Sequence, residues 1–225
     1  MKKIFRFVSL LLLVVLVAGV VVPSLPAKAS EQSDMETVLS DYTAGDYASA
    51  KAANEKLPAV SKEACVKKMS AKMKKAYKKV IAGYKGKPTT WFAFYYYLTD
   101  LNNDGKAELL VYAGKTAATT KLRAYQYKGG KAKKIAEESG GAQGAGLERY
   151  FCEYPGHEGF IIYVRNSMVM AEEIEVVTVQ DGTFHHETIG QRVYDLTKND
   201  LVPLRDCLYG HVNVKNGKTD YKAVS

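Results

Sequence analysis

In residues 97–111, YLTDLNNDGKAELLV, an acidic and amide-rich loop separates two apolar runs. Aromatic and aliphatic runs of this kind, bounded by Asp, Asn and Gly, are typical of β-strands. Gly105 lies where the loop must turn sharply, and glycine adopts the backbone angles of such turns without steric cost. The sequence therefore predicts two neighbouring strands joined by this loop.

The loop carries oxygen-bearing side chains at positions 1, 3, 5 and 9 counted from Asp100, with glycine at position 6. Alternate residues of a tightly turning loop point inward. Calcium prefers six to eight hard oxygen ligands, and water fills the places that the protein leaves open. The predicted metal ligands are the side chains of Asp100, Asn102, Asp104 and Glu108 and the backbone carbonyl of Lys106.

An EF-hand does not explain the loop, because position 12 is Val111 instead of a glutamate and the flanks are strand-like. The loop resembles the calcium loop of FG-GAP (integrin-type propeller) repeats, D-x-[DN]-x-D-G-x-x-[DE]-[LI], and of small exported bacterial proteins with a single such loop. The resemblance covers about fifteen to twenty residues. It implies a structural calcium site within a β-hairpin.

Two departures from the family pattern indicate a weak site. Asn103 stands where the family usually has glycine, and Asn102 replaces a common aspartate, which removes one charge. The motif occurs once, so a multi-blade propeller is not predicted. The alternative to a calcium site is a metal-free turn, because Asp, Asn and Gly favour turns by themselves.

Residues 1–29 have the composition of a secretory signal peptide. A cationic start precedes the apolar run Phe7–Val22, and Ala27 and Ala29 supply small residues before a cleavage point at Ser30. The alternative is an uncleaved anchor, but a spanning helix needs about 20 apolar residues and this run is shorter. We therefore expect a secreted or cell-surface protein with no transmembrane segment after cleavage, whether or not it stays associated with the wall.

Cleavage would also lower the formal net charge from +8 to +4, because residues 1–29 contain four cations and no acid. The overall basicity is then modest. Three cysteines remain, Cys65, Cys152 and Cys207, without C-x-x-C spacing, so no zinc site is predicted. Cys152 and Cys207 can pair after export or remain thiols; the sequence leaves both open.

Residues 30–88 are predicted to be helical. A capping box, Ser33 to Glu36, indicates a helix start near Ser33. The next predicted helix, Asp46–Leu57, resembles the "GDY..A" start of a tetratricopeptide helix and ends before Pro58. A third is expected to begin at Ser61 and end at the glycines after residue 82, because its apolar residues follow helical spacing.

The third predicted helix has a lysine-rich face. Its cations are Lys67, Lys68, Lys72, Lys74, Lys75, Lys78 and Lys79. Such a face can bind an anionic cell-envelope polymer, or it can simply be solvated. Nucleic acid is not a predicted partner, because the chain is expected to be exported and no recognition motif accompanies these lysines.

Residues 89–225 are predicted to form an antiparallel β domain. The expected strands are Trp91–Leu98, Glu108–Tyr112, Lys121–Tyr127, Leu147–Tyr154, Phe160–Arg165 and Glu173–Gln180. Tight hairpins are expected at Gly129–Gly130, Asp181–Gly182 and Asn216–Gly217. The predicted fold class is α+β, with N-terminal helices covering one face of a C-terminal antiparallel sheet, a meander of hairpins.

No motif in the sequence assigns an enzymatic activity. There is no G-x-S-x-G, no H-E-x-x-H and no phosphate-binding glycine loop, and His185 and His186 would point to opposite strand faces. We expect an exported, non-enzymatic, calcium-stabilised surface or binding domain of unknown ligand. The alternative is a secreted hydrolase acting on cell-envelope or extracellular polymers, because a fold without motifs can still host a dispersed site.

Overall fold

The computed structural model describes residues 27–57, 69–84, 93–140, 147–195, 197, 201–202, 204 and 210–211. The α-helices are α2 (Ala27–Ala44), α3 (Tyr47–Lys56) and α5 (Ala71–Gly83), and a short 3-10 helix is η2 (Ala117–Thr119). The strands are β1 (Ala93–Thr99), β2 (Glu108–Gly114), β3 (Lys121–Lys128), β4 (Lys131–Ser139), β5 (Leu147–Glu153), β6 (Phe160–Asn166), β7 (Ala171–Gln180), β8 (Thr183–Val193) and β9 (Gly210–His211).

The predicted α+β class is confirmed, but the strands form two sheets instead of one. Sheet A has the order β4-β3-β2-β1-β9 and sheet B the order β5-β6-β7-β8. Each strand pairing in the described residues is antiparallel, and most join strands that follow one another in the chain, as in a meander of hairpins. The division falls between β4 and β5. Buried clusters lie between the two sheets and between each sheet and its helices.

The two sheets pack face to face through aromatic and aliphatic side chains. From sheet A, Tyr97 and Tyr112 are at most 4% exposed, and from sheet B, Phe151 and Phe160 are at most 3% exposed. The rings of Tyr97 and Phe151 lie 4.4 Å apart between centroids. Burial of this area supplies the hydrophobic stabilisation that holds the sheets together.

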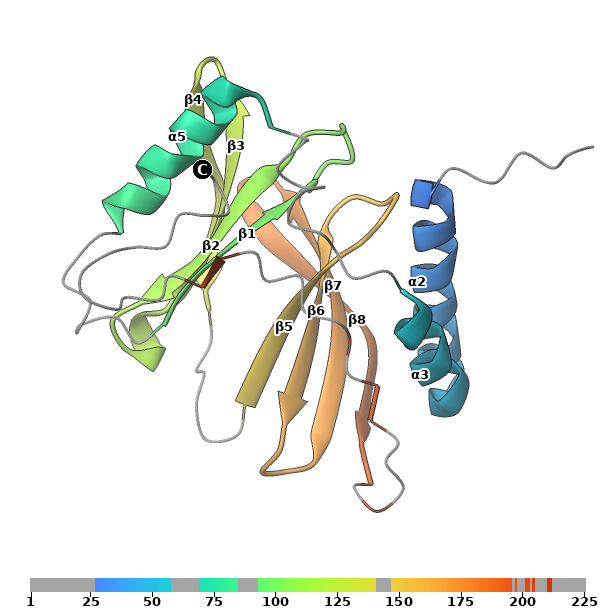
Figure 1. The fold of residues 1–225 in the computed structure, drawn as a ribbon. Helices are drawn as coiled ribbons and strands as arrows, with labels where there is room; N and C mark the ends of the chain where they lie inside the picture. The colour runs from blue at the N-terminus through green and yellow to red at the C-terminus, as the bar shows by residue number, and fades with distance from the viewer. Residues whose placement is uncertain are drawn as a thin grey trace, which may run out of the picture.

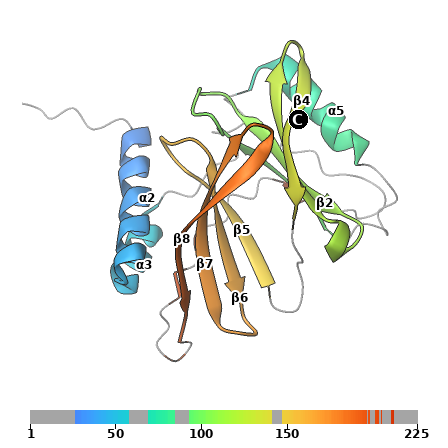
Figure 2. The ribbon, with the colours of Figure 1, turned by 180° about the vertical axis from the view of Figure 1, so that it is seen from behind.

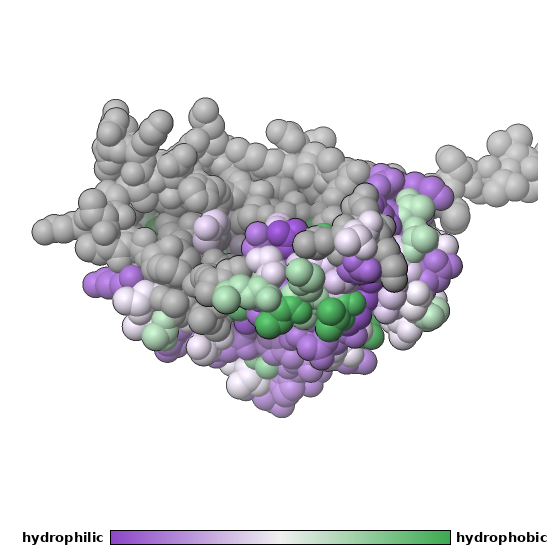
Figure 3. All heavy atoms as spheres, turned by 90° about the horizontal axis from the view of Figure 1, so that it is seen from below, coloured by the Kyte–Doolittle hydropathy of each residue, from purple (hydrophilic) through white to green (hydrophobic). Residues whose placement is uncertain are grey.

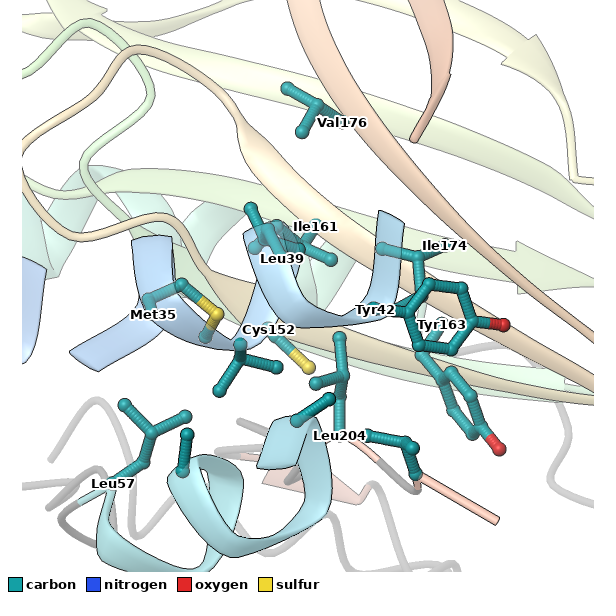
Figure 4. Close-up of a cluster of buried hydrophobic side chains, with 14 residues drawn as sticks. Met35, Leu39, Tyr42, Leu57, Cys152, Ile161, Tyr163, Ile174, Val176 and Leu204 are labelled. Carbon is teal, nitrogen blue, oxygen red and sulfur yellow. The ribbon is translucent and has the colours of Figure 1, made fainter. Parts of the chain in front are cut away.

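Helices cover the two outer faces of this sandwich, whereas the sequence predicted helices on one face (Figures 1 and 2). On sheet A, α5 packs through Tyr77 and Ile81, both fully buried. On sheet B, α2 and α3 pack through a cluster that includes Met35, Leu39 and Tyr42 (Figure 4). Strands with two apolar faces require a cover on each face, which explains the four layers.

Two of the three predicted helices begin at a different residue in the structure. Helix α2 begins at Ala27, upstream of Ser33, so the predicted capping box lies inside the helix and Glu36 hydrogen-bonds Gln32 instead. Helix α3 agrees closely with the predicted range, and the Asp46 side chain caps it by accepting from the Ser49 backbone N–H at 3.0 Å.

The predicted single helix from Ser61 is wrong, because Met69 and Ser70 are not helical. Ser70 has extended backbone angles and caps α5 by accepting a hydrogen bond from the Met73 N–H at 3.2 Å. Helix α5 therefore begins at Ala71. Residues 58–68, with Cys65, Lys67 and Lys68, lie outside the described residues.

The six predicted strands all overlap observed ones, while β4, β8 and the short β9 were not among them. The predicted hairpins at Gly129–Gly130 and Asp181–Gly182 are confirmed. Asn216–Gly217, Cys207 and residues 141–146 lie outside the described residues. Among the helices that the structure describes, none is both long and apolar enough to span a bilayer.

Candidate metal centre

The candidate site is the loop between β1 and β2. Thr99 pairs with Glu108 in the register of the two strands, so the loop closes on itself between them. The Asp100 carboxylate organises it, because Oδ1 accepts from the Asp104 N–H and Oδ2 from the Gly105 N–H, each at 2.9 Å. These bonds fold residues 100–105 around the Asp100 side chain, as the sequence predicted for a tight turn.

Two loop residues have left-handed backbone angles, Gly105 with φ 82° and Asn103 with φ 51°. Asparagine tolerates this conformation better than most residues. Asn103 therefore has backbone angles that glycine adopts readily. The Asn103 side chain also donates to the Gly156 carbonyl at 2.9 Å, a contact with the loop between β5 and β6.

Asp104 is held within the loop by its neighbour Lys106. Its Oδ1 accepts from the Lys106 N–H at 2.8 Å, and its Oδ2 lies 3.0 Å from the Lys106 Nζ. Burial opposes ionisation of this carboxyl, but the hydrogen bonds and charge of Lys106 outweigh burial and lower the pKa of Asp104. Asp104 is therefore a carboxylate at neutral pH.

Glu108 is the buried member of the site, 2% exposed. Its Oε2 accepts from the Leu101 N–H at 3.0 Å. Burial, together with the negative charges of Asp104 and Asp100, raises the pKa of Glu108 to about 7. The charges of Asp104 and Asp100 thus act on the buried Glu108, which is the situation that a bound cation relieves.

These residues fit a calcium ion in their chemistry. Each carboxylate oxygen has two lone-pair directions, so an oxygen that accepts one N–H can still approach a cation. Within the described ranges, however, no three His, Cys, Asp or Glu side chains form a ready-made metal cage. The predicted ligand set therefore depends on the Asn102 amide, the Lys106 carbonyl and water as well as on carboxylates.

The loop is also fastened to sheet B. The Gly159 N–H donates to the Leu101 carbonyl at 2.8 Å, next to the bond between Asn103 and Gly156. Gly159 has φ 94°, and a Cβ there would lie 2.3 Å from the Val177 carbonyl oxygen, so only glycine fits. No sequence pattern predicts these partners, because they are more than 50 residues away and belong to no motif.

The same β5–β6 loop reaches the helical layer. The His157 Nε2 lies 2.7 Å from the Glu36 Oε1 of α2, and the His157 ring stacks on Tyr154 at 4.2 Å between centroids. A continuous set of contacts therefore joins the candidate metal loop, the β5–β6 loop and α2. Any ligand that orders residues 100–108 acts at the junction of three layers.

Comparison with protein-family models, with curated proteins and with solved structures gave no match to the chain.

The histidines of β8 do not form a metal centre with the predicted loop. His185 and His186 pair with Thr178 and Val177, on opposite faces of the strand, as the sequence predicted. The His186 ring nitrogens bond two carboxylates, Glu175 at 2.9 Å and Glu138 at 2.8 Å. The two carboxylates raise the pKa of His186 to about 9. The imidazolium therefore links β8 to β7 within sheet B and to β4 of sheet A.

A small cavity lies between the sheets. It measures about 10 Å³ and is lined by Tyr97, Phe151 and Phe160 among others. Cys152 and Glu153 also line it, and Cys152 is 3% exposed. A cavity of this size admits a water molecule and no polymer segment.

Five of the seven lysines predicted to form a basic face lie on α5. They are Lys72, Lys74, Lys75, Lys78 and Lys79, and each is exposed or half-buried. The other two, Lys67 and Lys68, lie outside the described residues, and α5 itself begins at Ala71.

Proposed function

We propose that this chain is an exported, non-enzymatic domain that calcium stabilises at the β1–β2 loop and that serves as a surface or binding module. The observation that carries the calcium proposal is the action of the Asp100 and Asp104 charges on the buried Glu108 carboxyl of the same loop. Asp100 folds the loop, Asp104 stays ionised, and Glu108 is buried beside both charges. A divalent cation would offset this repulsion without any change of fold.

The ligands would be the side chains of Asp100, Asn102, Asp104 and Glu108 with the carbonyl of Lys106, and water would complete the shell. Asn102 is neutral, so the site has one charge fewer than the family pattern and its affinity should be in the weak range of extracellular modules. At a dissociation constant of about 0.1 to 1 mM, calcium at about 1 mM stabilises the fold by about 0.4 to 1.4 kcal/mol. An exported protein would meet calcium at such concentrations, because extracellular calcium reaches them.

A structural role is supported by where the loop lies. Leu101 and Asn103 bond the β5–β6 loop of sheet B, and that loop contacts α2 through His157. Ordering the turn would therefore strengthen the contact between the sheets. The described cavity, at about 10 Å³, offers no comparable support for hydrolysis of a polymer.

The test is thermal unfolding in calcium and in chelator. We expect calcium to raise the melting temperature by about 1 to 6 °C, which corresponds to the stabilisation above for a chain of this length. Asp104→Ala should abolish the rise. Asp104→Asn should reduce it while keeping an oxygen that can accept from the Lys106 N–H.

The matched control is Asp181→Asn, which alters an aspartate of another hairpin turn, between β7 and β8. It should leave the calcium-dependent rise unchanged. Identical melting curves of the wild-type protein in calcium and in chelator would refute the proposal.

A further inference from the structure

The large hydrophobic side chains that remain exposed gather at one end of sheet B. Among the residues that the structure describes they are Met168, Val169, Met170 and Val193, which are 43 to 74% exposed. The first three belong to the β6–β7 turn, and the register places Val193 of β8 opposite Ala171, the residue after that turn. We call these four residues the apolar tip. It lies at the end of the molecule away from the β3–β4 turn (Figure 1), and apolar side chains gather on the face seen from below (Figure 3).

Packing within the chain does not account for the apolar tip. The buried clusters of the described residues do not include its side chains. Single exposed hydrophobic residues are ordinary on soluble proteins, but a contiguous exposed patch marks a site of interaction with a protein or a membrane. The apolar tip is such a patch, because the β6–β7 turn and the end of β8 adjoin one another in the sheet.

Met170 has a backbone conformation that methionine rarely adopts. Its φ is 50°, in the left-handed region, whereas the other described non-glycine residues with positive φ are Asn103 and Asp181. Asparagine and aspartate tolerate this region better than other side chains do. Burial does not offset the strain, because Met170 is 43% exposed. Strain at an exposed residue points to a use of its side chain outside the fold.

The turn that carries the apolar tip bonds backbone groups from within the protein. The Met168 N–H donates to the Asn166 Oδ1 at 3.1 Å, and the Met170 carbonyl accepts from the Tyr194 N–H at 2.8 Å. An apolar medium offers no hydrogen bonds, so a loop enters it at low cost only where its polar backbone groups already have partners. These two bonds therefore suit a turn that leaves water.

The sequence of the turn carries no charge, and the arginines beside it are paired. Residues 166–171, NSMVMA, contain no acid and no cation. Arg165, next to them on β6, pairs with Glu148 at 3.2 Å, and Arg192 of β8 pairs with Glu172 at 2.6 Å. Entry of the tip into an apolar medium would therefore not remove water from an unpaired arginine.

We propose that the apolar tip inserts into a lipid bilayer, at the boundary between headgroups and acyl chains, and so docks the domain on a membrane surface. This inference specifies the partner of the surface module proposed above and rests on that function. A hairpin turn at the end of a sheet is convex, and a fluid bilayer deforms around a convex apolar group. Interfacial protein segments reach about 5 to 10 Å into this boundary, a depth that the side chains of one turn can occupy. Methionine side chains are flexible and adapt to irregular surroundings such as acyl chains.

A second copy of the chain and another protein fit the apolar tip less well. Each partner in a stable dimer buries about 800 Å², an area that four side chains at a hairpin end do not supply. The energetically important residues of protein interfaces are most often Trp, Tyr and Arg, whereas the tip consists of methionine and valine. The lysines of α5 are a separate feature, because α5 packs on sheet A. Binding through the tip should therefore be insensitive to salt.

The experiment measures cosedimentation of the protein with neutral phosphatidylcholine vesicles, in chelator and at low and high salt. It uses the protein recovered after export, in which residues 1–29 are expected to be absent and cannot bind lipid themselves. Met168→Ser/Val169→Ser should weaken binding about tenfold or more, because both side chains are exposed in the free protein and would be buried in lipid. Met170→Gly should weaken binding severalfold without lowering the melting temperature, because glycine adopts left-handed angles freely.

A tryptophan in the apolar tip locates the insertion. Brominated acyl chains should quench the fluorescence of Val169→Trp. They should not quench that of Lys131→Trp, which lies beside the β3–β4 turn at the other end of the molecule (Figure 1). The wild-type protein gives the baseline for its own Trp91. Equal quenching of the two variants would contradict insertion at the tip.

The control variant, Lys72→Gln/Lys75→Gln/Lys79→Gln, removes three lysines of α5 and should bind neutral vesicles as the wild type does. Binding that requires anionic lipid or is lost at high salt would overturn the tip as the membrane contact. Absence of vesicle binding, or a dimer that Met168→Ser/Val169→Ser abolishes, would overturn the bilayer as the partner. Because the measurement is made in chelator, its failure is distinguishable from failure of the calcium proposal.

Discussion

Glu108 is the residue at which burial and charge conflict most directly. Its carboxyl is buried, accepts one backbone hydrogen bond from Leu101, and lies close enough to Asp100 and Asp104 to feel both charges. Without a cation, the folded protein relieves the conflict by holding a proton on Glu108 below about pH 7. With calcium bound, the same carboxyl would ionise and serve as a ligand.

The proton on Glu108 predicts a pH dependence in chelator. Its pKa is about 7 in the folded protein and near 4.5 when exposed, so between these values the unfolded chain binds fewer protons. The free energy of unfolding should therefore fall as pH rises from about 4.5 to 7, by about 1 to 3 kcal/mol. Urea unfolding at several pH values measures this fall.

Glu108→Gln should remove most of that fall, because its amide does not titrate. The control Glu158→Gln changes an exposed glutamate of the β5–β6 loop and should keep the wild-type slope. A wild-type slope in Glu108→Gln would contradict the assignment of the titrating group.

For the β1–β2 loop, the sequence predicts which side chains form the turn. It does not predict how deeply they are buried or which distant residues they contact. The spacing of Asp100, Asp104 and Gly105 is local, and the structure shows the turn that it predicts. The raised pKa of Glu108 depends on burial by distant elements, and the partners Gly156 and Gly159 come from another sheet. No local pattern contains this information.

At one edge, the two sheets are linked by an ionic cluster of His186, Glu175 and Glu138, called the clasp below. His186 of β8 bonds Glu175 of β7 within sheet B and Glu138 of β4 in sheet A. Arg149 also acts electrostatically on Glu175. The clasp lies in polar strands, where the hydrophobic pattern gives no indication of a contact between sheets.

The clasp should stabilise the fold most at low pH. The pKa of His186 is raised from 6.5 to about 9, so the folded protein holds this proton where the unfolded chain has lost it. The stabilisation is then fully present below pH 6.5 and is lost as pH rises through about 9. His186→Gln should lower the free energy of unfolding by about 1 kcal/mol at pH 6 and by less above pH 9.

The neighbouring histidine provides the control. His185→Gln changes a side chain on the opposite face, which bonds Thr183 of its own strand. It should have no such pH-dependent effect in urea unfolding. Equal effects of the two substitutions would show that the clasp contributes nothing specific.

The helical layer on sheet B depends on a buried ion pair. Arg192 of β8 pairs with Glu172 of β7 at 2.6 Å, and its guanidinium lies 3.6 Å from the Tyr47 ring centroid of α3. The Glu172 carboxylate also accepts from the Tyr163 hydroxyl at 2.6 Å. The Glu172 side chain is fully buried, so loss of Arg192 would leave an unpaired charge inside the protein.

Arg192→Ala is therefore expected to lower the free energy of unfolding by about 3 to 5 kcal/mol. Arg165→Ala is the matched comparison, because Arg165 also pairs across strands, with the partly exposed Glu148. It should cost about 1 kcal/mol or less. Urea unfolding compares the two, and similar losses would show that burial of Glu172 is not the decisive factor.

The predicted strands succeeded where apolar residues dominate and failed where they do not. Strand β2 is buried along its whole length, and its apolar run indicates it directly. Strand β4, KAKKIAEES, and strand β8, TFHHETIGQRV, each lie at an edge of a sheet and expose many side chains. Their charged residues interrupt the apolar pattern by which a strand is predicted. The sequence nevertheless predicts the turn that precedes each of these two strands.

For the whole molecule, the alternation along the strands predicts buried faces but not the partner of each face. Strands with two apolar faces need a cover on each face, but their sequences do not show whether the second cover is a helix or another sheet. The sandwich arises because aromatic residues of both sheets pack together, as Tyr97 and Phe151 do. It places the β1–β2 loop against sheet B, where a weak metal site can affect stability.

The most direct test of the calcium proposal is a crystal structure of the protein grown with calcium. The account predicts one ion in the β1–β2 loop, with ligand oxygens at about 2.3 to 2.6 Å. The expected ligands are the side chains of Asp100, Asn102, Asp104 and Glu108 and the carbonyl of Lys106. A loop without an ion in saturating calcium, with Glu108 still bonded only within the protein, would contradict the account.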